Sequence, residues 1–340
     1  MAAFYACKRM SYYYDDTVSP LDLPDPIIGR SECINSYVES DGVEVEARVL
    51  ECESGNAFEF GRLLRKSIYG EVVQGYQLLI GERFYSRSDR KVAIKIYFRS
   101  RLPGASEYRE SAEDPFKEFA AMQYLQNPGC LNLVTLIECV EDANHIYFVM
   151  EFLEKELFDV VTMESVPESS AKMYFKQIVE GMEYLQSRSI CHRDISLENV
   201  MLSESGRAVI IDFGMCLLLP RHVMSGEVMN VGPQGTCGKK SYMAPEIYHN
   251  SSFNGFQSDV WSLGVLLYML LTKSAPYQYP STMDPHFRAI ALGRLPRYIR
   301  TMNVMLSPHA VDLLDKMLRV NPEDRITVSA IKTHPWLSTA

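Results

Sequence analysis

The chain has 340 residues, of which 47% are hydrophobic and 23% charged, and its formal net charge is -9. This length allows two domains or one large two-lobed domain, and the composition is typical of a globular protein. The negative charge argues against a general affinity for nucleic acid. No apolar run reaches the roughly 18 residues that a membrane helix needs.

The N-terminal residues and the cysteines indicate the cellular compartment of the protein. The first residues lack the basic start and apolar core of a secretory signal, and Ala2 excludes N-myristoylation. The eight cysteines show no paired metal spacing. They are typical of reduced thiols, which predicts a cytoplasmic or nuclear protein.

Residues 1–57 are polar and broken by prolines, so we expect a partly disordered N-terminal extension. Within it, residues 43–50 alternate apolar and polar side chains and predict one edge strand. Residues 58–150 predict a small sheet with one helix that begins at Asp114-Pro115. The buried face of that helix carries Phe119, Met122 and Leu125.

The remaining chain predicts helices. One spans 169–188, a second and very apolar one spans 259–271, and a third begins at Ser307-Pro308. Their expected buried residues are Phe175, Ile178, Val179, Met182, Leu185, Val311, Leu314 and Leu318. Strands followed by helices indicate an α+β, two-lobed architecture. We place the small β-rich lobe at 58–150, a hinge at 151–154 and the larger α-helical lobe at 155–337.

Two short motifs carry the chemistry. His192-Arg193-Asp194 is followed by Asn199, and Asp212-Phe213-Gly214 lies beyond it. The apolar run 208–211 between them predicts a strand, so the two loops face each other across one hairpin. Phosphoryl transfer from ATP needs this set, because one carboxylate accepts a hydroxyl proton while an Asn and a second carboxylate hold the metal.

Further segments occur in a fixed order along the chain. They are Val92-Ala93-Ile94-Lys95, Ala244-Pro245-Glu246, the run 259–264 that begins with Asp259, and Arg325. With these motifs, residues 58–337 resemble the eukaryotic protein-kinase family, Ser/Thr type, in a protist-like variant of the calcium/calmodulin-dependent group. The resemblance implies the two-lobed kinase fold, ATP and Mg²⁺ as cofactors, and transfer of the γ-phosphate to Ser or Thr of a protein substrate.

The resemblance also assigns roles to single residues. Asp194 is the general base, and Asn199 and Asp212 are the magnesium ligands. Lys95 contacts the α- and β-phosphates and is held there by Glu118, for which Glu107, Glu110 and Glu113 are alternatives. The expected nucleotide-binding residues are Gly70, Val72, Ala93, Lys95, Met150, Glu151, Leu153 and Met201. In this set Val72, Ala93 and Met201 sandwich the adenine, and the backbone of Glu151 and Leu153 bonds its edge.

The glycine-rich loop departs from the family pattern. In the best alignment, 65–72, Gly70 is the last of three expected glycines, and Arg65 and Ser67 occupy the other two positions. Side chains there loosen the cradle that backbone amides form around phosphates, although Arg65 or Lys66 adds positive charge. An alternative register uses Gly75 and Gly81.

A second departure concerns two positions that are neighbours in the family fold. Ser196 stands where most Ser/Thr kinases have a catalytic-loop lysine, and Lys239, after Gly238, stands where they have threonine. We interpret the pair as one exchange, in which the ammonium has moved from the catalytic loop to the docking loop. The alternative is two unrelated losses in a decaying enzyme.

The resemblance extends to substrate choice and control. Glu156 and Glu198 match acids that bind basic residues upstream of the phosphosite, or they are merely solvated. Thr236 is the candidate for activating phosphorylation, through a pair with Arg193. Asp259 is expected to hold the backbone around Arg193, and Glu246 and Arg325 are expected to form a buried structural pair.

Three functions compete at this point. The first is an active, monomeric Ser/Thr protein kinase that acts on a protein or peptide and binds neither nucleic acid nor membrane. The second is a pseudokinase or scaffold, which the damaged glycine loop and Ser196 suggest. The third is a small-molecule kinase, against which the docking segment at Ala244-Pro245-Glu246 argues.

Overall fold

The computed structural model describes residues 18–39, 42–81, 85–102, 115–164, 166–236, 238–301 and 305–338. These residues form two compact units. The barrel unit comprises 23–184 and 197–216, and the helical unit comprises 18–22, 185–196 and the residues from Leu217 onward. Strands dominate the first part of the chain and helices the rest, so the predicted α+β class is confirmed. The predicted lobe boundaries, 58–150 and 155–337, remain predictions.

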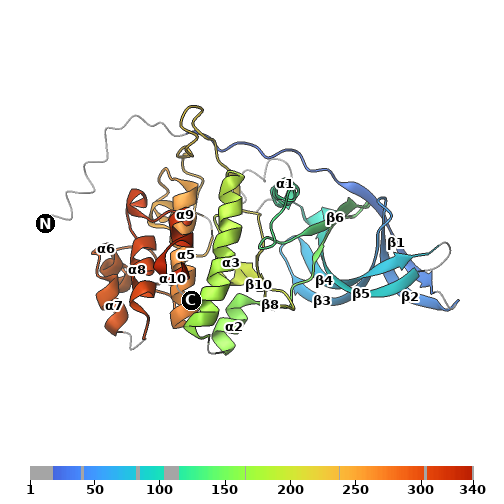
Figure 1. The fold of residues 1–340 in the computed structure, drawn as a ribbon. Coiled ribbons are helices and arrows are strands. Elements are labelled where there is room, and N and C mark those ends of the chain that lie inside the picture. Colours follow the sequence, from blue (N-terminus) through green and yellow to red (C-terminus); the bar gives the residue numbers. More distant parts are fainter. Residues whose placement is uncertain are drawn as a thin grey trace. The chain divides into compact units, whose positions relative to one another are not determined.

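A closed barrel of seven strands is the main feature of the barrel unit (Figure 1). Its strands follow one another around the barrel in the order β1-β2-β3-β4-β5-β7-β6. Their bounds are β1 Gly29–Val38, β2 Glu44–Cys52, β3 Ala57–Lys66, β4 Gly70–Ile80, β5 Tyr85–Phe98, β6 Leu136–Glu141 and β7 His145–Glu151. Only the β1–β6 pair that closes the barrel is parallel. Closure pairs every strand on both sides and leaves no edge.

The N-terminal extension differs from the sequence prediction. We expected one edge strand at 43–50, whereas β1 and β2 are both present and both complete the barrel. In β2 the buried residues Val49 and Leu50 gave a visible signal. In β1 only Tyr37 is fully buried and the register shifts between Ile34 and Ser36, so its pattern is weak.

The burial pattern of β5 shows which way the Lys95 side chain points. Val92, Ile94 and Ile96 of β5 are almost completely buried in the core together with Leu50, Phe58, Val73, Val140, Tyr147 and Val149. Because side chains alternate along a strand, Ala93 and Lys95 face away from that core. Helix α1 (Pro115–Leu125) buries Phe119, Met122 and Leu125 as predicted.

The rest of the barrel unit carries the hairpin of the two motifs. Strand β10 (Val200–Leu202) pairs with β11 (Ala208–Ile210) and with β8 (Lys155–Glu156). The predicted strand at 208–211 and its hairpin are therefore confirmed. Helix α2 spans Leu157–Met163, and most of helix α3 (Glu168–Ser187) also belongs to this unit. The predicted inner residues of α3 are all fully buried: Phe175, Ile178, Val179, Met182 and Leu185.

The helical unit contains a two-stranded sheet and seven α-helices among its described residues. The strands are β9 (Ile190–Cys191) and β12 (Leu217–Leu218), and the helices are α4 Pro245–Tyr248, α5 Gly255–Thr272, α6 Pro285–Ala291, α7 Leu295–Thr301, α8 Pro308–Met317, α9 Val328–Lys332 and α10 Pro335–Ser338. Ser307 caps α8 as predicted by accepting the Ala310 N–H. Of its predicted stripe, Leu314 and Leu318 are buried and Val311 is half-buried. No helix in the described ranges has the length and apolarity to cross a membrane.

Candidate active site

Lys95 and Glu118 form the ion pair that the sequence predicted. The Lys95 Nζ lies 2.7 and 2.9 Å from the two carboxylate oxygens of Glu118. The side chains are only 17% and 7% exposed, so water screens the pair little. Tyr97 donates its hydroxyl to the same carboxylate at 2.7 Å. The competing acids Glu107, Glu110 and Glu113 lie outside the described residues.

The charges around Lys95 keep it protonated. Burial alone lowers the pKa of Lys95, but the carboxylate of Glu118, together with Tyr97 and Asp212, holds the pKa well above its usual value. The ammonium is therefore a permanent cation directed away from the barrel core. A fixed cation of this kind is suited to bind phosphate oxygens.

The residues expected around adenine lie on three strands of the barrel unit. Val72, Ala93 and Met201 are each partly exposed, whereas their neighbours in β5 and β10 are buried. Val72 lies opposite Lys95 in the β4–β5 register, and Ala93 lies opposite Met150. Val72 and Ala93 thus lie on the face of the barrel that carries Lys95, whereas Met201 belongs to the separate sheet of β10.

The expected hinge begins at the end of β7. The Glu151 N–H donates to the Thr135 carbonyl at 3.0 Å. Because this donor is occupied, we expect Glu151 to contact adenine through its backbone carbonyl oxygen. The Glu151 carboxylate is held by the Arg207 guanidinium at 2.6 Å and by the Thr135 N–H. Leu153 is buried, with 6% of its surface exposed.

The β3–β4 turn, residues 67–69, is where the degenerate glycine loop lies. The structure requires glycine at position 70 for close packing within the sheet and not for phosphate binding. A Cβ on Gly70 would lie 1.7 Å from the Ile96 carbonyl oxygen. Gly75 sits in the middle of β4, opposite Val92, so the alternative register has no loop at that point. The Arg65 guanidinium lies 3.5 Å from the carboxylate of Glu156.

Asn199 and Asp212, the expected magnesium ligands, flank the β10–β11 hairpin. Asn199 is buried, and its carbonyl accepts the Ile211 N–H at 3.0 Å. Asp212 has a left-handed backbone (φ 66°), and its carboxylate accepts the Gly214 N–H at 3.2 Å. A strained backbone that fixes a side chain is common at functional sites.

The donor chemistry of these two residues fits Mg²⁺, which takes oxygen ligands and usually binds one or two carboxylates together with substrate phosphates. Within the described ranges, no three His, Cys, Asp or Glu side chains gather into a protein-only metal cage. Two oxygen-bearing side chains of this kind leave the other coordination positions of Mg²⁺ to substrate phosphates and water.

Asp259 fixes the backbone before the proposed base, as predicted. Its fully buried carboxylate accepts the N–H groups of His192 at 2.7 Å and Arg193 at 2.8 Å. Arg193 has a left-handed backbone, with φ 69°, and two charge-assisted hydrogen bonds hold this strained turn. Burial raises the pKa of Asp259, and the neighbouring His192 and the two N–H donors oppose that shift.

Lys239 and Ser196 are in direct contact within the helical unit. The Lys239 Nζ donates to the Ser196 hydroxyl at 2.9 Å and lies 3.6 Å from a carboxylate oxygen of Asp194. Ser196 is fully buried, and the Lys239 side chain is 36% exposed. The two departures from the family pattern therefore meet beside the expected base.

Gly238 allows this approach. Its φ of 81° suits glycine, and a Cβ there would lie 3.0 Å from both the Arg193 carbonyl oxygen and an Asp194 carboxylate oxygen. Any other residue would push the segment that bears Lys239 away from the catalytic loop.

Comparisons with known proteins agree with this arrangement. A sequence model of the protein kinase domain matches residues 80–337. The chain belongs to the protein kinase family. It is 32% identical over 300 residues to CBL-interacting serine/threonine-protein kinase 5 of Arabidopsis thaliana, covering 87% of this chain and 60% of that one. It is 30% identical over 297 residues to CBL-interacting protein kinase 1 of Oryza sativa subsp. japonica, covering 86% and 58%. The kinase chain thus spans three fifths or less of these relatives' length.

The kinase domain contains the predicted structural pair of Glu246 and Arg325. Arg325 donates two hydrogen bonds to the Glu246 carboxylate, at 2.6 and 2.7 Å, and its side chain is fully buried. Further donations to the Gln257, Arg319 and Val320 carbonyls satisfy the guanidinium. The pair is far more costly to break than an exposed ion pair.

The structure gives the exposure or position of the residues expected to act in control and substrate binding, but it does not show their partners in those roles. Thr236 is exposed, so its hydroxyl is accessible to a modifying enzyme. Glu156 meets Arg65, as described above, and Glu198 lies in the short 3-10 helix Leu197–Asn199.

Sequence reasoning missed two residues of the kinase site. Tyr97 binds Glu118, and Arg207 binds Glu151 at the hinge. Tyr97 carried a signal, because it lies two residues after Lys95 and thus on the same face of β5. Arg207 carried none, since only the fold brings it to Glu151.

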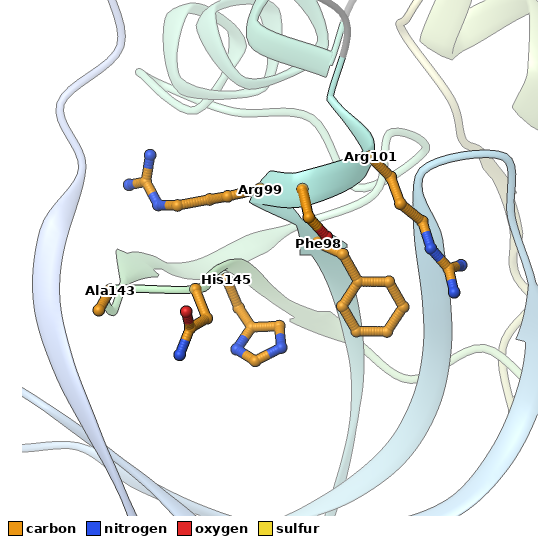
Figure 2. A pocket seen from close by; sticks show the side chains of 7 residues that line it. Phe98, Arg99, Arg101, Ala143 and His145 are labelled. Atoms are coloured by element: carbon orange, nitrogen blue, oxygen red, sulfur yellow. The ribbon is translucent and has the colours of Figure 1, made fainter.

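A cavity of about 260 Å³ lies elsewhere on the barrel unit. Residues 98–101 and 143–145 line it, and Figure 2 shows the Arg99 and Arg101 side chains pointing to opposite sides. Glu141 binds the Arg99 guanidinium. Diverging and partly neutralised cations do not form an anion site, and the expected ATP-binding residues are absent from the lining.

Proposed function

We propose that the chain is an ATP-dependent protein kinase that transfers the γ-phosphate to a Ser or Thr hydroxyl of a protein substrate. The observation that carries the proposal is the closed Lys95–Glu118 ion pair, 2.7 Å long and shielded from water. Kinase activity requires this pair, because it holds the lysine at the α- and β-phosphates. Both relatives named above are described as protein kinases, and the Arabidopsis one as a serine/threonine-protein kinase.

Each side chain has a defined task in this proposal. Lys95 binds and orients the nucleotide phosphates, and Val72, Ala93 and Met201 bind the adenine. Asn199 and Asp212 hold Mg²⁺, which neutralises charge on the phosphates when it is bound. An Asp194 carboxylate oxygen accepts the proton of the attacking hydroxyl and orients it toward the γ-phosphorus.

An active enzyme is favoured over a scaffold by the position of Lys239. Loss of the catalytic-loop lysine would by itself remove one cation from the γ-phosphate. The Lys239 ammonium lies 2.9 Å from the Ser196 hydroxyl, at the position left by that loss. We infer that Lys239 stabilises the charge that spreads over the transferring phosphoryl group.

Two features support a preference for substrates with a basic residue before the phosphosite. Glu156 already accepts a guanidinium, that of Arg65, at 3.5 Å. The net charge of -9 also favours a basic peptide over an acidic one. We infer that Glu156 and Glu198 receive the basic residue.

We place the protein in the cytoplasm as a monomer. None of the six described cysteines forms a disulfide, and we expect a reducing compartment. The exposed Thr236 is our candidate for the activating phosphosite, with Arg193 as the phosphate's partner.

The proposal is tested by incubating the purified protein with ATP, Mg²⁺ and a Ser/Thr peptide library that varies the upstream positions. We expect phosphate on Ser and Thr, and enrichment of upstream Arg. Asp194→Ala is the control that removes the base and leaves Lys95–Glu118 in place. Equal, background-level incorporation by both proteins would favour a scaffold.

A further inference from the structure

Residues 18–22 form two isolated β-bridges within the helical unit. The Leu21 N–H donates to the Leu218 carbonyl at 2.9 Å, in an antiparallel bridge. Val18 forms a parallel bridge with Val231, in which it donates to the Asn230 carbonyl and accepts the Gly232 N–H, each at 3.2 Å. Composition gave no sign of these pairings, because the segment is short, polar and proline-broken.

The Leu21–Leu218 bridge is connected to the catalytic loop through β12 and β9. Leu218 belongs to β12, which pairs with β9 in the register Leu218↔Ile190. Leu21 thus forms a single bridge to one strand of this two-stranded sheet. The chain leaves β9 at Cys191 and enters His192-Arg193-Asp194 with the next residue.

The Val18–Val231 bridge is connected to the same loop through Phe253. Val231 is fully buried and exchanges two backbone hydrogen bonds with Phe253, at 2.9 and 3.0 Å. The Arg193 guanidinium lies 5.7 Å from the centroid of the Phe253 ring, within the range of a cation–π contact. The two segments that pair with residues 18–22 are therefore linked, through β9 and through Phe253, to the loop that holds Asp194.

We propose that residues 18–22 are a positioning segment for the catalytic loop, acting through β12–β9 and through Val231–Phe253. The proposal rests on the kinase function only for its effect on the rate. The Leu21 side chain is 52% exposed, so the contact is made by the backbone N–H. Pro20 favours the extended backbone that these two bridges need.

The test compares two substitutions at one position. Leu21→Pro removes the N–H donor, and Leu21→Ala keeps it while losing a side chain that packs little. Hydrogen exchange reports on the His192 and Arg193 amides, which donate to Asp259. For loss of one backbone hydrogen bond we expect Leu21→Pro to speed exchange at 190–194 and 217–219 by roughly 2- to 12-fold. Leu21→Ala should match the wild type.

Kinetics provide the second readout. We expect Leu21→Pro to lower kcat with an unchanged KM for ATP, since the nucleotide-binding residues lie in the barrel unit. A deletion of residues 1–22, which retains all of β1, should give the same changes. Unaltered exchange at 190–194 in both Leu21→Pro and the deletion would overturn the proposal, as would an equal effect of Leu21→Ala. The exchange result stands whether or not the protein transfers phosphate, so it fails separately from the proposed function.

Discussion

Replacing Lys239 by threonine, the residue usual in the family, tests the exchange of the ammonium. Two unit charges about 4 Å apart interact by about 4 kcal/mol at an effective dielectric constant near 20. The Lys239 side chain is 36% exposed, so screening reduces this energy, and we expect a loss of about 2 kcal/mol. That loss corresponds to about a 30-fold lower kcat, within a range of about 10- to 1,000-fold.

The assay is steady-state phosphorylation of one peptide at saturating ATP. Lys240 is the matched control, because it is the next residue and exposed, and Lys240→Thr should leave kcat unchanged. Ser196→Lys alone should be harmful, since it buries a second ammonium beside the first. Combined with Lys239→Thr, it should recover part of the loss. A double variant whose loss equals the sum of the single losses would refute the exchange, because contacting sites should couple.

Three further outcomes follow from the geometry. Removing phosphate from Thr236 should lower kcat, because a phosphate paired with Arg193 orders the loop. Equal activity before and after phosphatase treatment, with the phosphate verified by mass spectrometry, would contradict this prediction. Arg325→Met should lower the free energy of unfolding in urea by about 3–5 kcal/mol, since it leaves Glu246 charged and buried; a loss below about 1 kcal/mol would contradict it. Burial alone raises the pKa of Asp284, but three backbone N–H donors hold it below its usual 3.8. Its stabilisation is therefore present above pH 3.8 and lost as the pH falls through the folded value, so Asp284→Asn should flatten stability against pH in that range, and an unchanged slope would argue against it.

The sequence predicted best where local pattern and chemistry coincide. Helix α3 carried its buried face in plain periodicity, and the resemblance to the kinase family indicated the Lys95–Glu118 pair, with three other glutamates as alternatives. The contact of Lys239 with Ser196 was visible as two compensating departures, because each residue was unusual for its position.

The sequence predicted worst where a strand's partner is distant. Strand β1 pairs with β6, more than 100 residues away, and its half-buried residues do not alternate clearly. The pairing of Leu21 with Leu218 depends on backbone groups, which every residue except proline carries alike. Such contacts leave no trace in side-chain composition.

The most direct measurement of the kinase assignment is transfer of labelled γ-phosphate to a serine peptide with an upstream arginine, in the presence of Mg²⁺. The wild type is run beside Asp212→Asn, which keeps the size of the side chain and removes the charge expected to hold the metal. We predict transfer by the wild type and a loss of at least about 100-fold in the variant. Equal transfer by both proteins, or transfer by neither, would contradict the account.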